Sequence, residues 1–95
     1  MKRLIEKDIE AHLVDAVKRA GGEHRKVNWL GRAGAPDRFI MLPGRAPVWV
    51  ELKAPGKKVE PHQEREHARM RSFGCNVVVI DSIADCETLV FGVSP

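Results

Sequence analysis

The sequence has few of the residues whose abundance would place it in a specialised class. It has two cysteines, three phenylalanines, two tryptophans and no tyrosine among its 95 residues. Two cysteines without a CxxC pair predict neither a disulfide scaffold nor a zinc site. We therefore expect Cys75 and Cys86 to be reduced and to pack as small apolar side chains in an intracellular protein. Apolar runs are also short, well below the roughly 20 residues that span a membrane.

The balance of charge is weakly basic and excludes little by itself. Charged residues make up 31% and hydrophobic residues 43% of the chain, which is the composition of an ordinary globular domain. The length indicates one domain over residues 1–95. A net charge of +3 is compatible with a polyanionic partner, although many unrelated domains share it. The charged N-terminal residues predict a helix rather than a secretory signal, so we expect a cytoplasmic location.

Apolar spacing and turn residues predict seven elements in the order helix, three strands, helix, strand and helix. An early hairpin and a later helical crossover indicate a mixed sheet flanked by helices, which is an α/β fold. Ser82 is a suitable N-cap for the last helix, and the tail from Phe91 is either irregular or an edge strand. The expected bounds are a helix from about Lys2 to Ala20, strands at Val27–Leu30, Arg38–Leu42 and Pro47–Lys53, a helix at Pro61–Phe73, a strand at Asn76–Ile80 and a helix from Ser82 through Leu89.

Three charged residues lie where the two central strands are expected to meet. Side chains alternate along a strand, so Glu51 and Lys53 point to one face and Leu52 points to the core. A turn centred near Gly44 gives paired residues whose numbers sum to about 89, which sets Asp37 opposite Leu52 to within one position. Two carboxylates at this range repel unless a proton or a hard divalent ion such as Mg²⁺ joins them. A surface ion pair and ordinary turn chemistry are plainer explanations, but they leave the convergence of all three residues unexplained.

Each long helix carries polar residues on its expected inward face. Glu6 projects between Ile9 and Leu13 within the apolar stripe, which is costly unless the carboxylate finds a partner. Either Glu6 favours the helix dipole in a frayed first turn, or it reaches the same cation site. Gln63 either satisfies backbone groups at the start of the second helix or hydrogen-bonds to the strand ends. His67 on that face is expected to be a satisfied core residue rather than a ligand.

Basic residues flank these elements in the sequence. Each alone is a solvated surface charge, but together around a metal site they would suit contacts with the phosphates of a nucleic acid. Aromatic residues are not interleaved with them, so a platform for stacking single strands is not indicated. We expect Trp29 and Trp49 to be core or interface residues. The candidate DNA-binding residues are Arg32, Arg38, Lys57 and Lys58.

The motifs in this part of the chain resemble those of the VRR-NUC domain in the PD-(D/E)XK nuclease superfamily. The resemblance rests on PD at residues 36–37, ELK at residues 51–53, PHQ at residues 61–63 and the run GCNVVVI from Gly74. It extends from Glu6 to about Ile80, which is most of the chain. The expected order of elements is similar to the restriction-endonuclease-like core of that superfamily, αβββαβ.

The resemblance implies a metal-dependent nuclease that hydrolyses phosphodiester bonds. Asp37, Glu51 and the backbone carbonyl of Leu52 would hold Mg²⁺ or Mn²⁺. Lys53 would position or activate the attacking water. The residues that would support the site are Glu6 and Gln63.

The resemblance also implies a substrate and an assembly. Stand-alone domains of this kind resemble Holliday-junction resolvases, so the implied substrate is branched or flap-like DNA in a bacterial or phage-infected cell. The implied assembly is a homodimer, because two sites across a two-fold axis would suit paired cuts. The alternative is a DNA-binding accessory module that does not cut, and a weaker one is a small interaction domain whose charges are only surface charges.

Overall fold

The computed structural model describes residues 3–92 of the 95-residue chain. The described part contains helices and strands in the order expected from the sequence. Their bounds are α1 (Glu6–Arg19), β1 (Glu23–Lys26), β2 (Arg38–Met41), β3 (Val48–Leu52), α2 (Pro61–Ser72), β4 (Val77–Ile80) and α3 (Ile83–Phe91).

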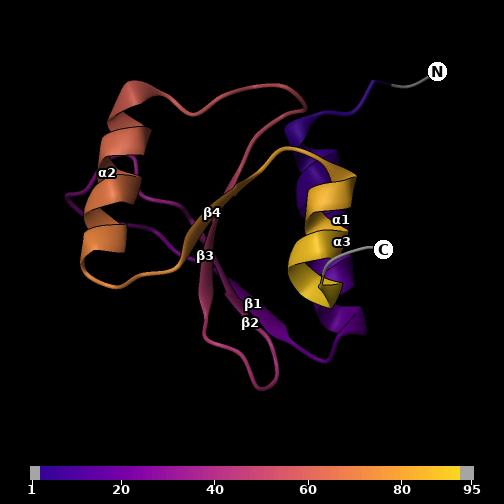
Figure 1. Ribbon diagram of the computed structural model, residues 1–95. Helices are drawn as coiled ribbons and strands as arrows, with labels where there is room; N and C mark the ends of the chain where they lie inside the picture. The colour runs from indigo at the N-terminus through magenta and orange to yellow at the C-terminus, as the bar shows by residue number, and fades with distance from the viewer. Residues whose placement is uncertain (1–2, 93–95) are drawn as a thin grey trace.

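The strands form one mixed sheet in the spatial order β1-β2-β3-β4. The pairs β1–β2 and β2–β3 are antiparallel, whereas β4 runs parallel to β3. A parallel pair needs a crossover connection, which α2 provides. Figure 1 shows α2 on one face of the sheet, with α1 and α3 side by side on the other. The expected mixed sheet flanked by helices is therefore confirmed.

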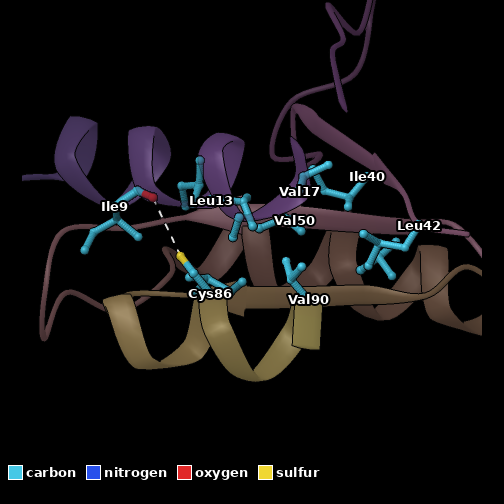
Figure 2. Packing of buried hydrophobic residues seen from close by; sticks show 12 residues of the cluster. Ile9, Leu13, Val17, Ile40, Leu42, Val50, Cys86 and Val90 are labelled. Atoms are coloured by element: carbon cyan, nitrogen blue, oxygen red, sulfur yellow. Dashed lines mark hydrogen bonds between the residues drawn. The ribbon is translucent and has the colours of Figure 1, made fainter. Parts of the chain in front are cut away.

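The face of the sheet under α1 and α3 holds the apolar core. α1 presents apolar side chains at helical spacing, and β3 contributes every second residue. Cys86 lies in this core with its Sγ atom 3.6 Å from the carbonyl oxygen of Ile9 (Figure 2). Both cysteines are free, and burial raises the pKa of the Cys86 thiol to about 11, as suits a packing residue. The buried cluster comprises Ile9, Leu13, Ala16, Val17, Ile40, Leu42, Val48, Val50, Leu52, Ile80, Cys86 and Val90.

The opposite face of the sheet is covered by α2 and by the loop between β1 and β2. The alternation of β3 turns Trp49 and Glu51 to this side. α2 buries only His67 and Met70, so its packing against the sheet is thin. A guanidinium nitrogen of Arg71 adds a hydrogen bond of 2.9 Å to the carbonyl of Val77 at the start of β4.

The first strand lies earlier in the chain than its apolar pattern predicted. Strand structure was expected over Val27–Leu30, but β1 is the polar segment Glu23–Lys26. The error arises because β1 is an edge strand with mostly exposed side chains, so it shows no apolar alternation. The apolar residues that suggested a strand instead form the loop that folds over β3.

The ends of the other elements agree with expectation to within a few residues. α1 begins at Glu6 rather than near Lys2, because Ile5 is extended and its N–H donates to Asp8 Oδ2 at 2.8 Å. Ser82 caps α3 through a hydrogen bond of 3.0 Å from the backbone N–H of Asp85, as predicted. Of the predicted tail, Phe91 belongs to α3 and Gly92 is its C-cap, whereas residues 93–95 lie outside the described residues. Within residues 3–92, no helix is long and apolar enough to cross a membrane.

Candidate active site

The hairpin of β2 and β3 brings Asp37 level with Glu51. The observed pairs, such as Arg38 with Val50, have numbers that sum to 88. Extending this register by one pair sets Asp37 beside Glu51, one position from the place first expected. Asp37 is exposed, Glu51 is largely buried and Lys53 is 8% exposed.

The electrostatics of Glu51 report which charges share this site. The pKa of its carboxyl is raised to about 7, mainly because burial disfavours the charged form. The positive charge of Lys53 opposes this rise, whereas the negative charges of Asp37 and Glu6 add to it. Three other residues selected from the sequence, Lys53, Asp37 and Glu6, therefore lie within electrostatic range of the Glu51 carboxylate. A cation placed among the three carboxylates would relieve their repulsion.

Glu6 reaches this site from a different position than the helical pattern indicated. It is exposed in the first turn of α1 and is not buried within the apolar stripe. The partly buried carboxylate on α1 is Glu10, which accepts hydrogen bonds from Arg38 Nε at 3.1 Å and Nη2 at 2.5 Å. These bonds lower the pKa of Glu10.

The side chain of Arg38 is consequently buried. It is 8% exposed, and its Nη1 atom also lies 3.2 Å from His24 Nδ1. This placement corrects the expectation that Arg38 lies on a surface open to DNA. The cause is its position on β2, where its side chain turns toward α1 and meets Glu10.

Gln63 does both of the things considered for it. Its Oε1 atom accepts a hydrogen bond of 2.8 Å from the backbone N–H of Glu60, which closes the N-terminus of α2. Its Nε2 atom donates toward Glu51 Oε2 at 3.5 Å. The two roles are compatible because the amide has separate acceptor and donor ends.

His67 lies one helical turn after Gln63 and also faces Glu51. It is 1% exposed, and its Nε2 atom lies 3.4 Å from Glu51 Oε1 without forming a hydrogen bond. Burial, together with the charge of Arg71, lowers the pKa of the imidazole. His67 is thus a core residue as expected, but it is not a satisfied one. The sequence signal was its spacing of four from Gln63.

The loop between β1 and β2 builds a cleft beside Asp37. Trp29 packs on Trp49 with ring centroids 5.0 Å apart, and its Nε1 atom donates to the carbonyl of Pro36 at 2.8 Å. These contacts hold the loop against β3 on the α2 side of the sheet. The cleft has a volume of about 420 Å³ and is lined by Lys26, Val27, Asn28, Trp29, Arg32, Ala35 and Asp37.

The same loop fits closely against the start of α2. A Cβ atom added at Gly34 would lie 2.9 Å from the carbonyl oxygen of His62 and 3.1 Å from Cα of Gln63. Gly34 also has a φ of +84°, a backbone conformation that residues other than glycine rarely adopt. Loop and helix therefore set each other's position next to Glu51.

Three of the candidate DNA-binding residues remain accessible. Lys57 and Lys58 are exposed in the loop after β3, and neither forms an ion pair with any described residue. Arg32 is exposed at the cleft, with its Nη1 atom 3.5 Å from Glu66 Oε1. Each could contact a phosphate without breaking the fold.

The donor atoms at the site fit a hard divalent ion. Asp37 and Glu51 offer carboxylate oxygens, which Mg²⁺ and Mn²⁺ prefer. The register sets Leu52 opposite Pro36, and proline has no N–H to donate to the Leu52 carbonyl, so that oxygen is a suitable third donor. Among residues 3–92, no three His, Cys, Asp or Glu side chains form a ready metal cluster. Mg²⁺ does not need three such side chains, because it keeps several waters in addition to two carboxylates and a carbonyl.

Comparison with known proteins gives a relative and a solved structure. No family model matches the chain. Over 81 residues it is 49% identical to "Putative nuclease p44" of Acyrthosiphon pisum secondary endosymbiont phage 1, a match that covers 84% of this chain and 87% of the relative. It also matches a solved structure described as "VRR_NUC domain" with a TM-score of 0.81 and 34% identity, covering 94% of this chain and 97% of the other.

Proposed function

The chain belongs to the VRR-NUC family, and from this membership we propose that it is a nuclease that hydrolyses DNA phosphodiester bonds with the help of Mg²⁺ or Mn²⁺. The observation that carries the proposal is the placement of Asp37 level with Glu51 at the end of the hairpin. The raised pKa of Glu51 supports it, because a carboxyl destabilised by burial and by neighbouring negative charge gains from a bound cation.

The site divides its roles among a few residues. Asp37, Glu51 and the Leu52 carbonyl would hold the ion. When bound, the ion would offset the negative charge of the phosphate and lower the pKa of a water. Lys53, whose charge acts on Glu51, would orient the attacking water or the phosphate. Gln63 would steady the carboxylate.

We propose that the substrate is branched or flap-like DNA, such as a Holliday junction. Arg32, Lys57 and Lys58 would contact phosphates, which positions DNA without reading its sequence. Leu30 is 89% exposed in the loop that builds the cleft. An apolar side chain so placed would suit a wedge between base pairs, and such a wedge enters most easily where stacking is already broken.

We further propose that the protein acts as a homodimer in a bacterial or phage-infected cell. Two copies related by a two-fold axis would present one site to each strand of a branched substrate. The exposed Phe73, at 75%, offers apolar area for such an association. Analytical ultracentrifugation would measure the mass, and a monomer at concentrations that support cutting would contradict the dimer.

The test of function is cleavage of three substrates. The folded protein is incubated with a four-way junction, a flap and a linear duplex, with Mn²⁺ or with EDTA. We expect cutting that needs the metal and favours the branched substrates. Absence of metal-dependent cutting on all three would contradict the proposal.

Variants connect the cutting to the site. Asp37→Asn and Glu51→Gln should each reduce the rate by about 10²- to 10³-fold, because each weakens charge stabilisation worth several kcal/mol. The matched control is Asp15→Asn, which changes an exposed carboxylate paired with Arg19 on α1. Its rate should equal that of the wild type.

The same experiment separates the alternative of a non-cutting accessory module. In that case the wild type and Asp37→Asn would bind a four-way junction equally well, and neither would cut with Mn²⁺. Circular dichroism of each protein shows whether it is folded in the assay.

A further inference from the structure

His67 has a buried nitrogen atom whose hydrogen-bonding capacity is unused in the described structure. The residue is 1% exposed, and its Nε2 atom has no hydrogen-bond partner. Buried polar atoms are almost always paired, so an unpaired one calls for a reason. A leucine of similar size would fill the same space without burying a polar group. Packing alone therefore does not account for a histidine here.

The polar group nearest to this nitrogen in the described contacts is the carboxylate of Glu51. Nε2 of His67 lies 3.4 Å from Oε1, and Nε2 of Gln63 lies 3.5 Å from Oε2. The two donors lie one turn apart on α2, so they approach both oxygens from the same helix. Gln63 already donates to Oε2, and a small shift of the imidazole would complete a second hydrogen bond, to Oε1.

Two other roles fit the surroundings of His67 poorly. Its buried Nε2 atom lies 3.4 Å from Oε1 of Glu51, so the imidazole meets the carboxylate and not an open ligand position. Its burial also keeps it from solvent, where a general base would meet water. The group that His67 can influence is Glu51 itself.

We propose that His67 is a positioning residue that donates a hydrogen bond from Nε2 to Glu51 Oε1 and, with Gln63, fixes the orientation of the carboxylate. A carboxylate has about four lone-pair positions. One donor on each oxygen from α2 leaves the remaining positions for a cation. This inference rests on the proposed function, because it assigns the held carboxylate to a divalent ion. Hydrogen-bond partners that orient a metal-binding carboxylate change the affinity of the site for the metal ion.

The test compares a variant without the donor and a variant that keeps it. His67→Leu removes the nitrogen at similar volume, whereas His67→Gln retains an amide N–H of similar reach. Isothermal titration of Mn²⁺ into the DNA-free protein measures affinity without cutting. We expect His67→Leu to weaken Mn²⁺ binding by about 10- to 100-fold and His67→Gln to stay within about threefold of the wild type.

A stability measurement distinguishes positioning from packing. The metal-free His67→Leu protein should unfold at the same or a higher temperature than the wild type, because an unpaired buried polar atom has been removed. The control is Met70→Leu, a volume-conserving change on the same buried face of α2, which should leave Mn²⁺ affinity unchanged. A role in packing would instead lower the unfolding temperature of His67→Leu together with its affinity.

A third measurement keeps this inference separate from the proposed function. In the metal-free protein, ¹⁵N NMR of the imidazole should show the proton on Nε2, and the signal should move in Glu51→Gln. If the protein shows this signal but cuts no substrate, the proposed function is overturned, whereas the contact between His67 and Glu51 is supported. Wild-type Mn²⁺ affinity in His67→Leu, or equal losses in His67→Leu and His67→Gln, would overturn the positioning role.

Discussion

The face of the sheet under α1 and α3 and the face under α2 differ in what they bury. Under α1 and α3 the buried side chains are mainly apolar, with a single paired arginine, Arg38, at the edge. Under α2 the protein buries His67 and most of Glu51, and it leaves the apolar side chain of Val79 38% exposed. The difference indicates that the apolar face under α1 and α3 supplies most of the folding stability. It offsets the cost of burying polar groups on the α2 face.

A single strand serves both faces. In β3, Val48, Val50 and Leu52 enter the apolar core, whereas Trp49 and Glu51 turn to the α2 side. A slip of one residue would exchange the two sets, burying Glu51 in the core. The turn at Gly44, with a φ of +69°, helps to keep this register.

The largest expected effect on stability is from removing a core side chain under α1. Leu13 is fully buried, so Leu13→Ala should cost about 2–5 kcal/mol of the free energy of unfolding, which is much of the stability of a small domain. The matched change on the other face is Val79→Ala, which should cost less than about 1 kcal/mol. Urea denaturation measures both. Equal losses would contradict the difference between the faces.

A smaller effect is expected where the loop meets α2. Gly34→Ala should cost about 1–3 kcal/mol and should also slow cutting, because the added Cβ would displace the start of α2 and with it Gln63. Gly92→Ala at the end of α3 is the control, since Gly92 also has a positive φ, +92°, but its Cβ would meet nothing within 4 Å. It should lose stability only, with the cleavage rate per folded molecule unchanged. Slower cutting by Gly92→Ala would mean that lost stability, and not the contact with α2, reduces the rate.

Much of this arrangement could be predicted from the sequence, because it follows from local spacing. The order of elements indicated the mixed sheet, and alternation along β3 with the hairpin register indicated that Asp37 and Glu51 meet. The positions of residues whose partners come from distant segments were harder to predict. Arg38 is bonded to Glu10 from 28 positions away, and no local pattern reveals that bond.

The state of His67 shows a second limit. Its spacing on α2 placed it on the inward face, as the structure confirms. Whether its nitrogen finds a partner depends on the distance between α2 and β3, which spacing does not contain. Glu6 was misplaced for a simpler reason, because the helix begins at Glu6 itself and leaves that side chain in the open first turn.

The pH dependence of stability tests the cost of Glu51 on the α2 face. Its carboxyl has a pKa of about 7 in the folded protein and an ordinary value of 4.5 when unfolded. The folded state therefore binds the proton more tightly, and this group's contribution to stability is lost as the pH rises from about 5 to 7. His67, whose pKa is lowered, acts in the opposite direction, because the unfolded chain takes up its proton first as the pH falls.

The comparison with Glu51→Gln isolates the carboxyl from the imidazole. Without metal, the wild type should lose about 1 kcal/mol relative to Glu51→Gln between pH 5 and pH 7.5, less than the full shift implies because Glu51 keeps some contact with water. Thermal unfolding across this range, in EDTA, measures the difference. Parallel curves for the two proteins would show that burying this carboxyl costs little.

The smallest expected effect concerns the exposed loop beside the cleft. Leu30 is 89% exposed, so Leu30→Ser should change the free energy of unfolding by less than about 0.5 kcal/mol. If the side chain enters broken stacking, the variant should cut a four-way junction several-fold more slowly while cutting a linear duplex at the wild-type rate. The control is Phe91→Ser, the loss of an exposed apolar side chain on α3, on the other side of the sheet, and it should leave both rates unchanged. A uniform decrease of both rates in Leu30→Ser would instead assign the loop to general DNA contact, and would contradict the idea that this side chain selects branched DNA.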